Sequence, residues 1–202
     1  MGILCASEII WDLKNLQLLE MKAAGAKAMH NTIDAGDAAD AGSGLVTIPL
    51  TAHGFSALSH IGIRGSTNYD GTYIIQSVAT NAFNILATFA AETFGGTETV
   101  RPELEPETFF RLIEARLHLS AVGGTSENFT IDLDSGQPAA AFHDVNLETE
   151  DMAAKASHIK YWGDELRFYN DDDKIIFQYA NTNNRNWGLE CKYLRALNTY
   201  SL

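Results

Sequence analysis

The spacing of apolar residues changes along this chain, from a helix-like pattern near the N-terminus to short strand-like runs beyond residue 44. Between residues 9 and 19 the apolar side chains of Ile9, Ile10, Leu13, Leu16 and Leu19 follow the period of an amphipathic helix, and Trp11 widens their apolar stripe. Residues 23–44 are rich in Ala, Gly and Asp, which bury too little apolar surface to offset the entropy of ordering. The pattern therefore predicts an N-terminal helix and linker over residues 1–44.

Two interpretations of this predicted helix are open. It packs on its own domain, as most amphipathic helices do, or it serves as an arm that docks on a neighbouring protein. The linker that follows favours the arm. We therefore expect residues 1 to about 40 to supply most contacts with other chains, through the apolar residues between Ile9 and Leu19.

Residues 45–100 carry a different pattern. The runs "LVTIPL", "LSHIGIRG", "GTYIIQSV" and "AFNILATF" are rich in β-branched and aromatic residues and are separated by turn-forming residues. The stretch Asn68-Tyr69-Asp70-Gly71 predicts a hairpin turn in which Gly71 holds a positive φ, while Asn68 and Asp70 bond nearby backbone groups. This region predicts a small β-barrel-like module.

Residues 101–202 predict a second β domain after the acidic connector "RPELEPETFF". Seven further candidate strands follow, in "ARLHLSAV", "ENFTIDLD", "AFHDVNLE", "HIKYW", "ELRFYN", "KIIFQYA" and "NWGLECKYL". Alternation places Leu117 and Leu119 on one face of their strand, and Phe129, Ile131 and Leu133 on one face of the next. We expect a mainly β chain that ends in an antiparallel, jelly-roll-like β-sandwich.

Two stretches resemble β domains of tailed-bacteriophage structural proteins. "HGFSALSHIGIRGSTNYDGTYIIQSVATNAFNI" resembles a small module of such proteins, with His53-Gly54, the segment 68–73 and Phe83 in the recurring places. "YANTNNRNWGLECKYL" is similar to the last strands of sandwich domains in phage virion proteins. The resemblance covers about residues 45–195, and it implies a place in a virion rather than a reaction.

Charge and composition narrow the classes of partner. The chain of 202 residues has a net charge of −12, with 26 acidic against 14 basic residues, which argues against a nucleic-acid partner. It has no apolar run of the roughly 20 residues that a membrane span needs. Glu8, Asp12 and Lys14 interrupt the N-terminal apolar stretch, so we do not expect a signal peptide there. Cys5 and Cys191 are expected to be free thiols.

The candidate chemistry is sparse, and we expect no catalytic residue, no metal and no cofactor. The six histidines, His30, His53, His60, His118, His143 and His158, lack the spacing of a zinc site. Glu148, Glu150 and Asp151 are expected to lie in an acidic loop, and Asp171 to Asp173 in a solvated turn. The C-terminal aromatic residues favour core packing over a sugar-binding platform; they are Tyr161, Trp162, Phe168, Tyr169, Tyr179 and Trp187.

The resemblance and these expectations together predict a non-enzymatic virion protein of a tailed bacteriophage. Within that class we expect a capsid auxiliary or decoration protein, held by its arm to the major capsid protein or to neck or tail proteins, and homo-oligomeric in the particle. The alternative is a neck, tail or fibre-associated protein whose sandwich binds carbohydrate. Burial of Trp162 and Trp187 would remove the support for that alternative.

Overall fold

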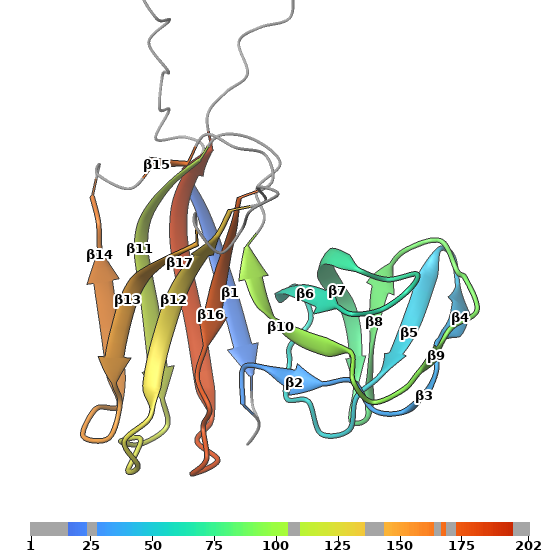
Figure 1. Ribbon diagram of the computed structural model, residues 1–202, viewed down its shortest axis with the longest axis horizontal. Helices are drawn as coiled ribbons and strands as arrows, with labels where there is room; N and C mark the ends of the chain where they lie inside the picture. Colours follow the sequence, from blue (N-terminus) through green and yellow to red (C-terminus); the bar gives the residue numbers. More distant parts are fainter. Residues whose placement is uncertain are drawn as a thin grey trace, which may run out of the picture.

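The computed structural model describes residues 16–23, 28–104, 110–135, 144–163, 167–168 and 173–195, and within these ranges the chain forms antiparallel β-sheets with no helix. Figure 1 shows two units side by side, a small module and a larger unit of two sheet layers. The strands are β1 Leu16–Ala23, β2 Asn31–Thr32, β3 Gly36–Asp37, β4 Ala39–Gly42, β5 Leu45–Pro49, β6 His60–Arg64, β7 Gly71–Ala79, β8 Ala82–Leu86, β9 Thr93–Phe94, β10 Thr99–Leu104, β11 Phe110–Leu119, β12 Asn128–Asp134, β13 Val145–Asp151, β14 Ser157–Tyr161, β15 Arg167–Phe168, β16 Lys174–Gln178 and β17 Trp187–Arg195.

The small module is built from the four runs that the pattern predicted as strands, which form β5 to β8. The strands lie in the order β10-β6-β7-β8-β5-β4, while β2 pairs with β10 and β3 pairs with β9. Alternate residues point inward, so that Ile61, Ile75 and Phe83 are almost fully buried. The prediction of β-strands in these four runs is confirmed.

The larger unit has two layers (Figure 1). One sheet has the order β1-β17-β11-β14, with β15 also paired to β11, and the other has the order β13-β12-β16-β10. Leu117 and Leu189 from the first sheet and Phe129 and Phe177 from the second are fully or almost fully buried in a common core. Each of the seven predicted strand segments contains a strand, although the strand in "ELRFYN" is only the two residues of β15.

Strand β10 belongs to both units, so the sheet of the small module runs on into a layer of the larger one. Its first four residues pair with β6, and Glu103 and Leu104 pair with β16. The expected domain boundary at residue 100 falls inside this strand. The start of the predicted acidic connector is therefore β-sheet.

The predicted N-terminal helix is wrong for the part of it that the structure describes. Leu16 and Leu19 lie in β1, which pairs with β17 along its whole length from Leu16 to Ala23. An apolar run this short fits a helix or a strand, and the long-range partner β17 decides the outcome. The other proposed contact residues, Ile9, Ile10, Trp11 and Leu13, lie outside the described residues.

The linker interpretation of residues 23–44 is also wrong from residue 28 onward. Met29 and Ile33 are fully buried and Ala38 is nearly so, and this stretch supplies β2, β3 and β4. Small residues permit close approach of neighbouring strands, so a composition that suggests a linker also suits the edge of a small module.

The turn between β6 and β7 differs from the prediction in its register. Gly71 is the first residue of β7, where it pairs with Ile63, and its φ is not positive; the positive φ, 83°, is at Gly65. Asp70 does bond a nearby backbone group, because its carboxylate accepts the N–H of Ser66. Asn68 instead donates its side-chain N–H to the distant carbonyl of Ala91. The two strands are thus joined by a longer, docked loop rather than a four-residue turn.

Candidate functional site

A connected group of charged side chains links an edge strand of one sheet of the larger unit to an edge strand of the other. β13 is the edge of one sheet and β14 the edge of the other, and a short turn joins them. β13 contributes Glu148 and Glu150, β14 contributes His158 and Lys160, and the turn contributes Lys155. We call these five residues the edge cluster.

The edge cluster is arranged around the imidazole of His158. Its Nε2 lies 3.1 Å from Glu148 Oε1, and its Nδ1 lies 3.4 Å from Glu150 Oε2. The second oxygen of each carboxylate is taken by a lysine, with Lys160 Nζ 2.6 Å from Glu148 Oε2 and Lys155 Nζ 2.5 Å from Glu150 Oε1. The Lys155 hydrogen bond is the main reason that the pKa of Glu150 lies below its ordinary value.

Glu148, Glu150 and His158 each offer one ligand atom, and these three atoms lie within 4.8 Å of one another. Two carboxylates and an imidazole are ligands that a divalent metal could use. The two lysines already balance the two carboxylates, so a dication would bring uncompensated positive charge. The arrangement is an ion-pair network that joins β13 to β14, and so links the edges of the two sheets.

The sequence prediction missed the edge cluster. It placed Glu148 and Glu150 in an acidic loop, which is wrong because both lie in β13. Metal ligands on a helix typically lie four residues apart, whereas here the partners are Glu148 and Glu150 on one strand and His158 after the following turn. Asp151 ends β13, and its pKa is lowered mainly by the N–H of Ala153 and next by the hydroxyl of Ser126.

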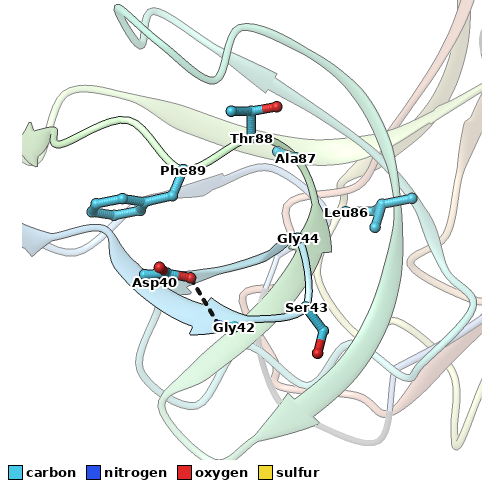
Figure 2. Close-up of a pocket in the computed structure, with 8 residues that line it drawn as sticks. All are labelled: Asp40, Gly42, Ser43, Gly44, Leu86, Ala87, Thr88 and Phe89. Carbon is cyan, nitrogen blue, oxygen red and sulfur yellow. Dashed lines mark hydrogen bonds between the residues drawn. The ribbon is translucent and has the colours of Figure 1, made fainter.

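A shallow pocket of about 700 Å³ lies in the small module (Figure 2). The turn between β4 and β5 forms one side, and residues 86–89 form the other. The Asp40 carboxylate accepts the N–H of Gly42 at 2.8 Å, so it is used within the turn. Leu86 is 64% exposed and Phe89 is 41% exposed. The pocket thus suits contact with apolar side chains better than bond-making chemistry.

The distinctive residues of the first resembling stretch hold loops in place. His53 is buried, its Nε2–H faces the carbonyls of Ala79 and Ala82 at 2.8 and 3.1 Å, and its Nδ1 accepts the N–H of Phe55. This histidine therefore fastens the turn between β7 and β8.

The loop between β6 and β7 is fastened in a similar way. The Glu92 carboxylate accepts the N–H groups of Thr67 and Asn68 at 2.7 and 2.9 Å. The Tyr69 hydroxyl donates to the carbonyl of Ala90 and accepts its N–H. Backbone and side-chain bonds thus dock the loop onto residues 90–92.

The second resembling stretch is held by its asparagines. Asn181 accepts the N–H of Arg185 and donates to its carbonyl, both at 2.8 Å. Asn183 donates to the carbonyl of Gly123 and to the hydroxyl of Thr125, both at 2.7 Å. These contacts close the turn before β17 and join it to the loop after β11.

The aromatic residues of the larger unit are mostly part of the core. Trp187 and Tyr179 are buried, and Trp162 is partly buried and packs on the core. Tyr161 is exposed, and the side chains of Phe168 and Tyr169 lie outside the described residues. The expected preference for core packing is confirmed for Trp187 and Tyr179, and Trp162 and Trp187 do not form an exposed platform.

The remaining candidates are scattered. Asp173, at the end of the predicted solvated turn, is buried, so that expectation is wrong for this residue, and Asp171 and Asp172 lie outside the described residues. Cys191 is a buried free thiol whose pKa is raised by burial, as the prediction of a free thiol requires. Cys5 lies outside the described residues.

No protein-family profile matches the chain, and no curated protein matches it. In the part of the chain that the structure describes, no helix has the length and apolar character to cross a membrane.

Proposed function

We propose that the chain is a non-enzymatic structural protein of a tailed-bacteriophage particle, and within that class a capsid auxiliary or decoration protein. The observation that carries the proposal is the use made of the two stretches that resemble phage virion domains. The side chains of His53, Tyr69 and Asn181 all form hydrogen bonds to the backbone of loops and turns. Because the characteristic residues of these stretches hold the fold together, they support a structural role for the protein.

The architecture supports the same proposal. The two facing sheets of residues 101–202, completed by β1, suit the jelly-roll-like sandwich that the resemblance implies. Stretches of exposed sheet edge, such as β4 with its four exposed residues, offer surfaces for protein contacts. In this proposal residues 1–15, including the apolar positions from Ile9 to Leu13, form the arm that binds a major capsid protein or a neck or tail protein, and the protein works in the virion without a cofactor, a membrane or nucleic acid.

Carbohydrate binding by the larger unit is the weaker candidate. It depended on a flat pair of exposed indole rings, and Trp187 is only 4% exposed. Tyr161, 67% exposed, shares the exposed face of β14 with the aliphatic side chain of Ile159, so the described part of this strand presents no second aromatic ring beside it.

The number of copies in purified particles tests the proposed function. We expect quantitative mass spectrometry to find the chain in amounts comparable with the major capsid protein. A few copies in each particle would move it to the neck or tail. Its absence from particles, with the protein present in infected cells, would contradict the proposed class.

A further inference from the structure

The edge cluster faces the core of the larger unit rather than the solvent. Glu148 and Glu150 pair with fully buried residues of β12, and residues directly opposite each other on paired strands point to the same side of a sheet. His158 in the same way pairs with the fully buried Leu117 of β11. The side chains of His158 and Glu148 are only 13% and 14% exposed, so water has little access to the contact between them.

The two ring nitrogens of His158 face two different carboxylates. Nε2 lies 3.1 Å from Glu148 Oε1, and Nδ1 lies 3.4 Å from Glu150 Oε2. An ionised carboxylate can only accept a hydrogen bond. A neutral imidazole carries one N–H, so it can donate to one carboxylate while its other nitrogen, which is an acceptor, faces the second. Only the imidazolium, with an N–H on each nitrogen, can donate to both.

The charges around His158 accommodate one additional positive charge. The two lysines of the edge cluster balance its two glutamates. Asp151, at the end of β13, is a third carboxylate, and it interacts electrostatically with Glu150. Strands β12 and β11 contribute apolar groups, namely the ring of Phe129, whose centroid lies 6.3 Å from that of the imidazole, and the side chain of Leu117. An imidazolium at this position is therefore matched in charge.

We propose that the edge cluster is a pH-sensitive link between the two sheets of the larger unit, closed by the imidazolium of His158. In the closed state the charged ring joins β14 to both carboxylates of β13. When the ring loses a proton, one nitrogen becomes an acceptor, and it repels its carboxylate in a site that water enters poorly. The lysine pairs remain, so the link weakens and the β13–β14 edge opens more often. This link does not depend on the proposed virion role.

The effect of His158 on stability is opposite in direction to that of His30. His158 stabilises the edge as a cation, so its contribution is present at acid pH and is lost as the pH rises and the ring becomes neutral. Burial, together with the charge of Arg101, lowers the pKa of His30, so the cationic form of that residue is disfavoured in the fold. Because the two residues lie in different places, the edge has to be followed by a local measurement rather than by the unfolding of the whole chain.

Hydrogen exchange of the full chain, followed by mass spectrometry at about pH 6 and about pH 8.5, tests the proposal. After correction for the pH dependence of the chemical exchange rate, we expect the protection of amides in residues 145–161 to be about tenfold lower at the higher pH. Amides of β1, at the opposite edge of the sheet that contains β14, are the internal reference and should show no comparable change.

Three variants identify the groups responsible. His158→Gln should remove the pH response, because the amide does not titrate. Glu150→Gln should also remove most of it, since its amide can donate to the acceptor nitrogen of a neutral ring. His118→Gln is the matched control: His118 is exposed on β11, opposite Ser157 of β14, and its replacement should leave the response unchanged.

The ring protons of the parent chain give a second measurement, which requires no variant to fold. In the acid form both N–H protons of His158 should be visible by NMR, because each faces a carboxylate and is shielded from water, whereas those of the exposed His118 should exchange too fast to be seen. Equal protection of residues 145–161 at the two pH values would overturn the proposal. So would a response that persists in His158→Gln, one that Glu150→Gln leaves at full size, one that His118→Gln removes, or the absence of either ring proton of His158.

Discussion

At the scale of single residues, the junction of the two units depends on one buried carboxylate. The Glu103 side chain is fully buried in β10, and both of its oxygens are engaged. Oε2 accepts from Arg101 Nε at 3.0 Å, while Oε1 accepts from Arg64 and from the Thr72 hydroxyl. A buried charge is tolerated only with such partners, because its removal from water is costly. Gly62 leaves the space that the carboxylate occupies.

Gly62→Ala should destabilise the protein by about 2 kcal/mol or more. The new Cβ would lie 2.5 Å from Glu103 Cδ and 2.7 Å from its Oε1, and the carboxylate has no open direction in which to move without breaking an ion pair. Urea unfolding monitored by tryptophan fluorescence measures the change. Gly188→Ala is the control, since a Cβ there meets nothing within 4 Å. Equal midpoints for the two variants would mean that Glu103 relocates freely.

At the scale of elements, β1 is a strand of the larger unit, although it lies far from the other strands of that unit in the sequence. Its eight residues pair with β17, and Leu19 lies opposite the fully buried Cys191. The expectation that residues 1 to about 40 form an external arm therefore reduces to residues 1–15. An experiment that removes the arm must stop before Leu16.

Two truncations separate the arm from the strand. Removal of residues 1–15 should leave the unfolding free energy nearly unchanged but abolish incorporation into particles that lack the protein, if the arm carries the contact. Removal of residues 1–23 also deletes β1, and should lower the unfolding free energy by several kcal/mol.

Thiol labelling reports the loss of β1 directly. In a Cys5→Ser background the only thiol is Cys191, which is buried and has a raised pKa, so it should react slowly in the shorter truncation. It should react much faster without residues 1–23. Equal labelling rates of Cys191 in the two truncations would show that β17 stays protected without β1. In the incorporation experiment, undiminished binding of the chain without residues 1–15 would mean that other residues contact the particle.

At the scale of the whole molecule, several pKa shifts act on stability in the same direction. The pKa of Glu98 lies below its ordinary value of 4.5, because its carboxylate accepts its own backbone N–H and that of Gly95. Such a carboxylate stabilises the fold above the unfolded pKa, and this stabilisation is lost as the pH falls through the lowered folded value. Burial, together with the charge of Arg101, lowers the pKa of His30 below 6.5. Below that pH the unfolded state takes up the proton first, so stability again decreases.

The free energy of unfolding should therefore fall as the pH decreases from 7 to about 4. Glu98→Gln should be less stable than the parent chain at pH 7, and the difference should shrink below pH 4.5, where the parent loses its carboxylate. His30→Gln should flatten a different window, just below pH 6.5. Urea titrations at several pH values measure both effects. A Glu98→Gln difference that stays constant down to the acid limit would show that its charge has no part in the stabilisation.

The sequence by itself determined the mainly β character and the position of most strands. Alternation in "ARLHLSAV" or "ENFTIDLD" is a local property, because successive side chains of a strand point to opposite faces whatever the partner strand is. Hence the four runs of the small module and the seven of the larger unit could be placed without knowledge of their neighbours. The bond between Asp70 and the loop backbone was predictable because the Asp side chains of turns bond backbone groups close to them in sequence.

Only the tertiary structure decided the state of β1, the conformation of Gly71 and the assembly of the edge cluster. Leu16 to Ala23 is a strand because β17 is available to pair with it, and Gly71 is extended because Ile63 lies opposite. His158 meets Glu148 and Glu150 because the edges of two sheets converge. Pairing between distant strands depends on the whole fold, so the local pattern leaves it undetermined.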